Sequence, residues 1–374
     1  MIAMDHLCCA GCGNPWSVPI MSLATLRHSW LSRITSCAGF LALAVTPMPA
    51  QAKARPRAPK APISLPVGAC INLGNHLDMA RGGEIRSNRL TPADFARIKA
   101  AGFETVRLPV NWSSHSASTP PYAIDTAWLA RVDQVVDGAL DAGLKVILNS
   151  HNFDPVNEDP AAAAPWLAAV WQQLGDHYAT RPRSRLWFEI ENEPNHALTN
   201  ANLMATFAPA LAAIRRHNPD RPVIIGGEHW SGVDSLATLN LPADPQVWPT
   251  FHYYDPFDFT HQGASWVSPS PPLGRAFGSD SDRERLAQNV AKVRAYSLRT
   301  GKIPLMGETG AYESIPGPQR AAYYRAVFQA FRPAGVPICV WAYVNTFPFY
   351  DAKQGQWKPG MLGAIGLHEP AARH

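Results

Sequence analysis

The stretch RLWFEIENEPNH, Arg185–His196, decides how the rest of the chain is interpreted. It is an apolar run that carries glutamates at three alternate positions and ends at a proline: Glu189, Glu191, Glu193 and Pro194. Side chains on a β-strand alternate between two faces, so the three carboxylates are expected to share one face, unless a local bulge turns Glu191 outward. Glu189, the deepest of the three, is expected to be a buried anchor that needs a cationic or hydrogen-bonding partner. We therefore predict a buried strand whose last glutamate, Glu193, stands at the strand's end.

Eight short apolar or β-branched runs, this one included, alternate along the chain with segments of helical spacing. The expected strands are Gly68–Leu73, Thr105–Val110, Lys145–Ser150, Arg185–Ile190, Pro222–Gly226, Gln246–His252, Ile303–Gly307 and Val336–Tyr343. One helix is expected to begin after Thr91. The others are expected at about Thr126–Ala142, Ala163–Ala179, Asn200–His217, Asp282–Arg299 and Pro318–Phe331. This alternation is typical of a parallel sheet covered by helices.

The boundaries of the expected helices carry their own signals. Thr91 is a capping residue and is followed by Pro92, which suits the first helical position. Gly102, Gly143 and Gly301 occupy places where the end of a helix favours a left-handed residue.

Strand–helix units repeated eight times, without a break in composition, predict one α/β domain with a (β/α)8 TIM barrel over residues 67–374. The alternative is an open doubly wound sheet, which usually has a glycine-rich phosphate loop after its first strand. The segment Asn72–His76 (NLGNH) is not such a loop. Sites in barrels form at the C-terminal ends of the strands, so chemistry is expected there.

The N-terminal part of the chain is expected to lie outside the fold. The apolar run Cys37–Val45 follows basic residues and precedes a small-residue cleavage site that ends at Ala52. Residues 1–52 are therefore predicted to be a signal peptide, with Met21 as an alternative start, and the protein to be secreted, to a periplasm or out of the cell. Residues 53–66 form a Pro-rich basic spacer, expected to be extended and mobile.

The charge of the chain is concentrated in that N-terminal part. Residues 1–60 hold six basic residues and one acidic residue, or +5, whereas the whole chain has a formal charge of +4, which leaves −1 for residues 61–374. A near-neutral body lacks the basic surface that binds phosphates, so no nucleic acid is expected as a partner. We expect a monomer that is not membrane-bound after signal cleavage.

Of the six cysteines, only Cys70 and Cys339 lie beyond the leader. Two cysteines supply too few ligands for a structural metal site. They could form one disulfide or remain two buried free thiols, and the free thiols are the favoured interpretation.

Polar or aromatic residues stand in or just after the C-terminal ends of all eight expected strands. In chain order they are Asn72 and His76, Arg107, His151 and Asn152, Asn192 and Glu193, Glu228, His229 and Trp230, His252 and Tyr254, Glu308, and Trp341. Each alone has a structural explanation, such as an ion-pair partner or a packed aromatic. Together they indicate a site, because buried polar groups cost stability unless they are paired or have a task.

Two of these residues, Glu193 and Glu308, end the fourth and seventh strands and are expected to face each other across the barrel mouth. Such a pair suits glycoside hydrolysis, in which one carboxylic acid protonates the departing oxygen while a second carboxylate attacks or activates water. Arg107, His252 and Tyr254 are placed to keep one of the two carboxylates ionised. This chemistry requires neither a metal nor a cofactor.

Seven segments stand in order on successive expected strands: ACINLGNHLD, VRLPVNW, LNSHN, WFEIENEP, FHYYDPFDFTHQGASW, MGETGAY and VWAYVNTFPFYD. They resemble motifs of glycoside hydrolase family 5, the cellulase-type retaining (β/α)8 enzymes, and the resemblance covers residues 66–360. It implies that Glu193 is the acid/base and Glu308 the nucleophile of a covalent mechanism.

The same resemblance implies roles for neighbouring residues. Asn192 would hydrogen-bond the 2-hydroxyl of the sugar in the cleavage subsite. Arg107 and Tyr254 would orient Glu308, and the ring of Trp341 would form the floor on which the sugar stacks. The other residues expected to line the sugar-binding site are Asn72, His151, Trp230, His252, His261 and Trp266.

Three positions depart from the family's pattern or extend it. Asn152 stands where many similar proteins have a second histidine, and Glu191 stands at a usually apolar position of the acid/base motif. Glu228 is a further carboxylate at a strand end, interpreted as a sugar contact or a loop anchor.

The loop YDPFDFTHQGASW, Tyr254–Trp266, most resembles endo-acting β-1,4-glucanases. We therefore predict a β-glucan polysaccharide or oligosaccharide as substrate, with mannan and xyloglucan as alternatives on the same site. A non-catalytic sugar-binding barrel is the alternative of another class, but it would be expected to have lost one of the two glutamates.

Overall fold

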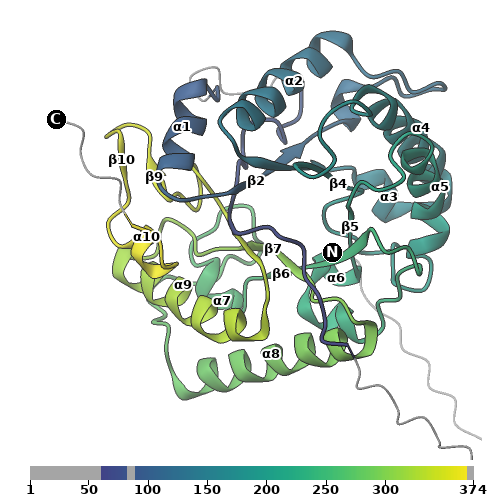
Figure 1. The fold of residues 1–374 in the computed structure, drawn as a ribbon. Helices are drawn as coiled ribbons and strands as arrows, with labels where there is room; N and C mark the ends of the chain where they lie inside the picture. Colours follow the sequence, from purple (N-terminus) through teal and green to yellow (C-terminus); the bar gives the residue numbers. More distant parts are fainter. Residues whose placement is uncertain (1–59, 82–88, 369–374) are drawn as a thin grey trace, which may run out of the picture. The chain divides into compact units, whose positions relative to one another are not determined.

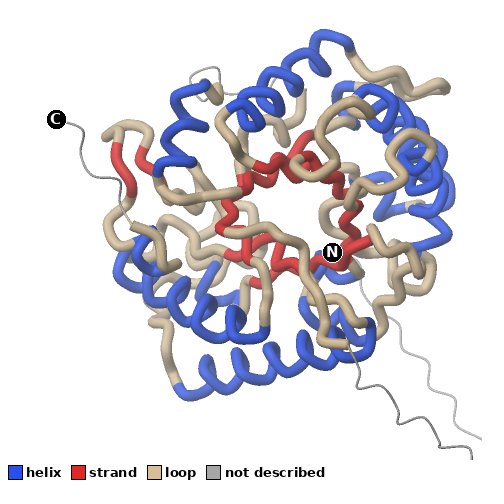
Figure 2. Tube along the Cα trace, in the orientation of Figure 1, coloured by secondary structure: helices blue, strands red, loops and turns tan. Residues whose placement is uncertain are grey.

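Eight parallel strands, β1 to β8, pair in chain order and close into a barrel, because β8 pairs with β1 as well as with β7. In Figure 2 the strands form a ring, drawn in red, with the helices outside it. The computed structural model describes residues 60–81 and 89–368, and the predicted signal peptide, residues 1–52, lies outside them. The predicted (β/α)8 fold is confirmed.

Every predicted strand is present, with ends that differ from the prediction by a few residues at most. The strands are β1 (Ala69–Asn72), β2 (Thr105–Val110), β3 (Lys145–Ser150), β4 (Leu186–Glu189), β5 (Val223–Gly226), β6 (Val247–Tyr253), β7 (Leu305–Thr309) and β8 (Ile338–Val340). Apolar side chains from seven of the strands and the segment before β1 fill the barrel interior: Leu65, Val67, Cys70, Ile147, Trp187, Ile224, Trp248, Leu305 and Cys339.

The outer layer consists of long helices that pack their apolar faces on the strands (Figure 1). These are α1 (Pro92–Ala100), α2 (Thr126–Asp141), α4 (Pro160–His177), α5 (Leu203–Arg215), α8 (Asp280–Thr300) and α9 (Gly317–Phe331). Short elements lie between them: α3 (Asp154–Glu158), α6 (Glu228–Ser231), α7 (Phe257–Thr260), α10 (Met361–Ala364), η2 (Ser113–His115), η3 (Val233–Ala237), η4 (Arg332–Ala334) and the hairpin β9 (Tyr350–Asp351) and β10 (Gln356–Trp357). None of the helices in the described ranges is long and apolar enough to cross a membrane.

The predicted helix boundaries are confirmed where their signals were strongest. Thr91 and Asp94 form a capping box at the start of α1, with a proline in its first turn. Gly102, Gly143 and Gly301 have φ angles of 93°, 76° and 74°, the left-handed conformation that ends helices.

The repeat is less regular than eight equal strand–helix units. After β5 the chain makes only α6 and η3 before it enters β6, so no long helix covers this step. These short elements form part of the barrel mouth, because Trp230 of α6 donates its backbone N–H to the carbonyl of Pro194 at 2.9 Å. The connection between β5 and β6 is therefore short and compact, and it contacts the chain at the end of β4.

The folded domain begins earlier than the predicted end of the spacer at residue 66. Ile63 exchanges backbone hydrogen bonds with the segment before β7, donating to Gly301 at 3.0 Å and accepting from Ile303 at 2.7 Å. Leu65 is 4% exposed and plugs the N-terminal end of the barrel. The last residues of the predicted spacer are thus part of the barrel, whereas residues 53–59 lie outside the described ranges.

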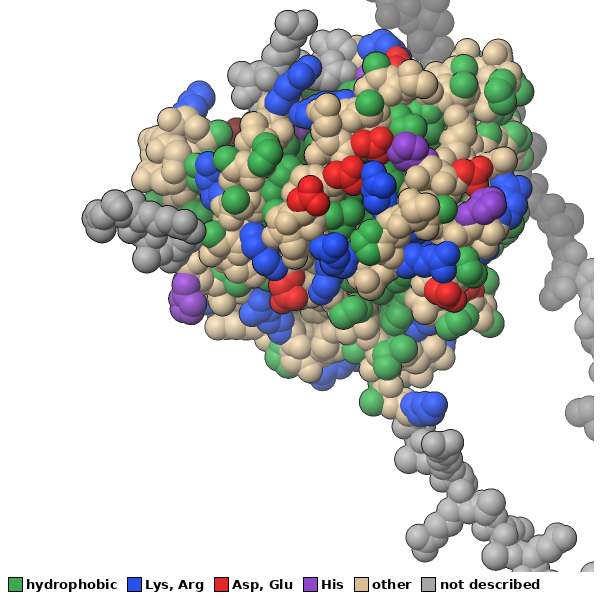
Figure 3. All heavy atoms as spheres, turned by 45° about the horizontal axis from the view of Figure 1, so that its top comes forward, with side chains coloured by type: hydrophobic (Ala, Val, Ile, Leu, Met, Phe, Trp, Pro, Cys, Tyr) green, Lys and Arg blue, Asp and Glu red, His purple; other side chains and the backbone are tan. Residues whose placement is uncertain are grey.

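Acidic and basic side chains are interspersed on the face drawn in Figure 3, where Lys and Arg lie next to Asp and Glu. Several are close pairs, such as Arg181 with Asp137 at 2.8 Å and Arg215 with Asp244 at 2.7 Å. This mixture agrees with the near-neutral charge of residues 61–374.

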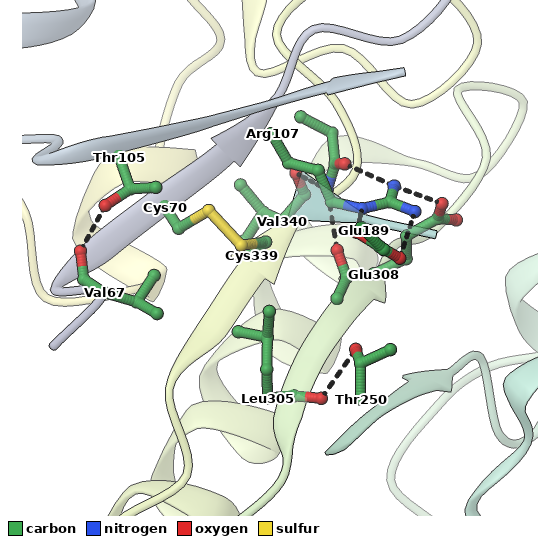
Figure 4. Close-up of a disulfide and its surroundings, with 12 residues drawn as sticks. Val67, Cys70, Thr105, Arg107, Glu189, Thr250, Leu305, Glu308, Cys339 and Val340 are labelled. Atoms are coloured by element: carbon green, nitrogen blue, oxygen red, sulfur yellow. Dashed lines mark hydrogen bonds and ion pairs between the residues drawn. A yellow bond between two sulfur atoms is a disulfide. The ribbon is translucent and has the colours of Figure 1, made fainter. Parts of the chain in front are cut away.

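Cys70 and Cys339 form a disulfide, so the prediction of two buried free thiols is wrong. The two residues are direct partners in the β1–β8 pair, and both side chains lie in the barrel interior (Figure 4). They are 269 positions apart in sequence, and only closure of the barrel makes their strands neighbours. The bond crosslinks the seam between the first strand and the last.

The double variant Cys70→Ala/Cys339→Ala is expected to lower the free energy of unfolding by about 2–5 kcal/mol, because the unfolded chain regains the freedom of a very long loop. Thermal unfolding should then show a Tm lower by roughly 5–15 °C. As a control, dithiothreitol should lower the Tm of the wild type and leave that of the double variant unchanged. Equal Tm values for wild type and variant would contradict a stabilising crosslink.

Candidate active site

The site is built around the guanidinium of Arg107, which enters the barrel from β2 and is fully buried. A guanidinium has five N–H groups, and each one here has an acceptor. Nε donates to Glu189 Oε2 at 2.7 Å, Nη2 to Glu189 Oε1 at 3.0 Å and Asn192 Oδ1 at 2.6 Å, and Nη1 to Asn72 Oδ1 at 2.9 Å and Glu308 Oε1 at 2.7 Å. Arg107 therefore fixes side chains from β1, β7 and the end of β4 (Figure 4).

Asn72, expected to contact substrate, lies fully buried beside Arg107. Its Nδ2 donates to the carbonyls of Gly307 at 3.0 Å and Val340 at 3.2 Å, while its Oδ1 accepts from Arg107. All the hydrogen-bonding groups of this amide are engaged within the protein, so Asn72 positions Arg107 and joins β1 to β7 and β8.

Glu308 points into the barrel because of an irregularity in β7. The β6–β7 register pairs Phe251 with Met306 but His252 with Glu308, so Gly307 is an extra residue. Leu305 belongs to the interior cluster, and strict alternation would turn Glu308 outward; the bulge restores its inward direction. A Cβ on Gly307 would meet Thr250 Oγ1 at 2.8 Å, which favours glycine at this position.

The carboxyl of Glu308 is kept ionised. Burial by itself raises its pKa, but the charges of His252 and Arg107 and a hydrogen bond from Tyr254 outweigh burial, so the pKa is lowered overall. The hydroxyl of Tyr254 donates to Glu308 Oε2 at 2.9 Å. Arg107 and Tyr254 thus hold both oxygens of Glu308, as expected.

Glu193 has the opposite electrostatic setting. It follows β4, its side chain is 27% exposed at the mouth, and its Oε1 lies 2.6 Å from His252 Nδ1. Burial is the largest cause that raises its pKa, and the negative charge of Glu308 raises it further, so the contact with His252 only partly compensates. The pKa of His252 is itself raised: burial lowers it, but Glu308 and Glu193 outweigh that effect.

One carboxylate oxygen of Glu193 and one of Glu308 lie within 4.8 Å of each other and of a His252 ring nitrogen. These three residues are the candidate metal ligands among the described residues. However, Glu308 already contacts the Arg107 cation, and Glu193 already contacts His252. The trio is thus satisfied by its protein neighbours, and we assign no ion to it.

Trp341 follows β8 and lies parallel to His151, with ring centroids 5.9 Å apart and an interplanar angle of 10°. The backbone at Gly74 packs closely on the indole of Trp341, since a Cβ on Gly74 would meet that ring at 2.5 Å. Burial lowers the pKa of His151 to about 3, so this imidazole is neutral near pH 7. The indole offers a flat surface for the apolar C–H face of a sugar, and the neutral imidazole offers a polar group for its hydroxyls.

The outer predicted residues lie on the loops after β5 and β6. Trp230 is 51% exposed and meets His196 edge to face, and Trp266 is 52% exposed and meets Tyr312 in the same way. His261 is buried and contacts Tyr254 edge to face at 5.1 Å, and burial lowers its pKa to about 4. The two half-exposed indoles extend the apolar surface away from the glutamates.

Comparison with known proteins gives this geometry a family. The sequence profile described as Cellulase (glycosyl hydrolase family 5) matches residues 78–346. The chain belongs to this family. Endoglucanase H of Acetivibrio thermocellus is 33% identical over 275 residues, which cover 74% of the present chain and 29% of that relative. The chain thus spans less than a third of the length of this relative.

Solved structures of family 5 proteins share the fold. One described as a hyperthermophilic endo-beta-1,4-glucanase in complex with substrate has 34% identity and a TM-score of 0.76, and the match covers 80% of this chain and 97% of that chain. Thermotoga maritima Cel5A, solved in complex with mannotriose, has 33% identity with the same TM-score and coverage.

The three glutamates of the opening stretch do not share one face in this family 5 barrel, so that prediction is wrong. β4 ends at Glu189, which Arg107 binds through both oxygens, as expected of an anchor with a cationic partner. The chain then bends, and Asn192 rather than Glu191 takes the next inward position. Glu191 is 2% exposed and accepts a hydrogen bond from Ser150 at 2.8 Å.

Two of the departures from the family pattern have local structural roles. Glu228 accepts the backbone N–H of Asn200 at 2.9 Å, which makes it a loop anchor. Asn152 donates to the carbonyl of Asp78 at 2.9 Å and ties the loop after β3 to that after β1.

Asp78 is a residue that the sequence reasoning did not single out. Its carboxylate accepts the backbone N–H groups of Asn75 and His76, both at 2.9 Å. Burial raises the pKa of Asp78 to about 6. Asp side chains commonly bond the backbone N–H groups of a nearby turn. An Asp close to the turn after β1 is therefore the sequence signal that suggests this contact.

Tyr254→Phe removes one hydrogen bond that keeps Glu308 ionised. Because the ionised form loses a donor, the pKa of Glu308 should rise, and the acidic limb of kcat/KM against pH should move to higher pH by up to about one unit. Hydrolysis of an aryl β-cellobioside across the acidic range measures the shift. Tyr253→Phe is the matched control, because its hydroxyl lies near Asn289 outside this network. An acidic limb that stays in place in Tyr254→Phe would contradict the role of Tyr254 in keeping Glu308 ionised.

Proposed function

We propose that this family 5 protein is a glycoside hydrolase that cleaves β-1,4-glucan by double displacement, with Glu308 as nucleophile and Glu193 as acid/base. The observation that carries the proposal is a pair of carboxyl groups that have one oxygen each within 4.8 Å of the other and whose pKa values are shifted in opposite directions. Retaining glycosidases need a separation of about 5–5.5 Å, whereas inverting ones need roughly 6.5–9.5 Å to admit a water.

In the first step an ionised oxygen of Glu308 attacks the anomeric carbon. The bond from that carbon to the glycosidic oxygen breaks, and the departing oxygen takes the proton of Glu193. The products are a leaving chain with a free hydroxyl and a sugar ester of Glu308. Arg107 and Tyr254 keep Glu308 in place and ionised until the attack.

The second step reverses the proton transfer. The ester removes the negative charge of Glu308, which had helped to raise the pKa of Glu193, so Glu193 now holds its charge more easily. It takes a proton from water as the water oxygen attacks the anomeric carbon, and the ester bond to Glu308 breaks. His252, bonded to Glu193 at 2.6 Å, steadies the carboxylate in this state.

Binding groups surround the reacting carbon. Asn192 is fixed through its Oδ1 by Arg107, and we assign its remaining amide group to the 2-hydroxyl of the sugar. Trp341 with His151 forms the stacking floor of the same subsite, and His261 lines its wall beside Tyr254. The half-exposed Trp230 and Trp266 are assigned to sugar units farther along the chain.

The proposed substrate is β-1,4-glucan, with mannan and xyloglucan as the alternatives on the same site. Related proteins support glucan and mannan as candidates, since Thermotoga maritima Cel5A has been solved in complex with cellobiose and with mannotriose. Glucose and mannose differ only in the direction of the 2-hydroxyl, and Asn192 is the group assigned to it.

We also infer that the protein is secreted after removal of a leader. The buried Cys70–Cys339 disulfide supports this, because disulfides form and persist in oxidising compartments such as the periplasm or the cell exterior.

Release of reducing sugar from carboxymethyl cellulose, glucomannan and xyloglucan tests the activity. Wild type should act on at least the first, and Glu308→Ala should lose activity by a factor of roughly 10⁴ or more, because covalent attack is abolished. Hydrolysis by this variant at the wild-type rate would overturn the nucleophile assignment. No release by wild type from any of the three would favour a sugar-binding barrel without catalysis.

The stereochemistry of the product is an independent test. Two successive displacements should leave the first-formed product in the β configuration, which proton NMR detects before mutarotation. A first-formed α product would show single displacement and contradict the covalent step.

A further inference from the structure

Glu191 is a buried carboxyl group that the proposed mechanism does not use. It lies two residues before Glu193, is 2% exposed, and burial raises its pKa to about 8, so it is uncharged near neutral pH. The hydroxyl of Ser150 donates to it at 2.8 Å, and the backbone N–H groups of Asn192 and Phe153 lie close enough to offset part of the rise in its pKa. An apolar residue of this size would fill the space but make none of these contacts.

The contacts of Glu191 begin where the pairing of the strands ends. The β3–β4 register ends at the pair Asn149 and Glu189, so the residues of the two chains beyond it are not paired. Ser150 and Phe153 belong to the chain leaving β3, whereas Asn192 belongs to the chain leaving β4. The side chain of Glu191 therefore continues the link between the two strands after their backbones separate.

The segment held in this way carries the acid/base. On its inner side Asn192 is fixed by Arg107, and on its far side the carbonyl of Asn192 accepts from Ser231 at 3.1 Å. Trp171 donates to the carbonyl of Ile190 at 2.9 Å from the outer helix layer. Toward β3, Ser150 bonds Glu191 before the acid/base, and the side chain of Asn157 accepts the backbone N–H of Asn195 at 3.0 Å after it. Loss of Glu191 therefore loosens the part of the segment that leads into Glu193.

We propose that Glu191 is a positioning residue for the acid/base, holding Glu193 in register with the glycosidic oxygen by tying the ends of β3 and β4 together. The proposal rests on the assignment of Glu193 as acid/base above. Glu191 acts through backbone placement, because its buried carboxyl is bonded to Ser150 and lies beside two backbone N–H groups. The expected consequence is a selective weakening of proton transfer when the tie is removed.

Two substrates with different leaving groups distinguish a misplaced acid from a general loss of structure in the active site. Cellotetraose needs a proton on its departing oxygen, whereas 2,4-dinitrophenyl β-cellobioside leaves without one. Glu191→Leu should lower kcat/KM for cellotetraose by roughly 10- to 100-fold, since small displacements of a catalytic group cost about that much, and change the aryl glycoside less than about twofold. Glu191→Gln, which keeps a neutral acceptor, should restore kcat/KM for cellotetraose to within about threefold of wild type.

Ser150→Ala removes only the 2.8 Å bond and should show the same selective loss to a smaller degree, so it decides the question if Glu191→Leu does not fold. Glu104→Gln is the control: its carboxylate lies 3.5 Å from Lys145 at the opposite end of β3 from Ser150, and both substrates should be unaffected.

Equal losses on both substrates, or no loss on either, in Glu191→Leu or Ser150→Ala would overturn the proposal. Failure of wild type to cleave either substrate would instead overturn the proposed function on which it rests.

Discussion

A single buried cation organises this barrel's mouth. Arg107 has no exposed surface, and its five N–H groups bind Glu189, Glu308, Asn192 and Asn72. Removing a partner from such a network would leave a buried charge unpaired, which costs several kcal/mol. The anchor Glu189 balances part of the charge, so the remaining positive field acts on Glu308. The ion pair of Arg107 with Glu189 and the ionised state of Glu308 thus depend on the same guanidinium.

The fold could be predicted from the sequence because periodicity and punctuation agree. β-branched runs, the capping Thr91 and the terminal glycines each mark an element that the structure contains. The Cys70–Cys339 bond could not be foreseen from spacing, since it depends on which strands meet when the barrel closes. The lack of a long helix after β5 agrees with the sequence, because no helix is expected between Pro222–Gly226 and Gln246–His252.

The site could be predicted as far as residue types at strand ends allow. Glu193, Glu308, Arg107, His252 and Tyr254 do meet in one network of hydrogen bonds and ion pairs. What sequence alternation could not give was direction: a bulge at Gly307 turns Glu308 inward, and a bend after Glu189 replaces Glu191 by Asn192 at the inner face. Each irregularity shifts the alternation by one residue, and both occur close to one of the two glutamates proposed to react, Glu308 and Glu193.

The central claim is that Arg107 holds Glu308 ionised so that it attacks the sugar. Incubation with 2,4-dinitrophenyl 2-deoxy-2-fluoro-β-cellobioside, followed by proteolysis and mass spectrometry, tests it most directly, because the fluorine slows hydrolysis of the ester. The account predicts one fluorocellobiosyl group per protein, on the peptide that contains Glu308. A label on Glu193, or no label on an enzyme that turns over the unfluorinated glycoside, would contradict it.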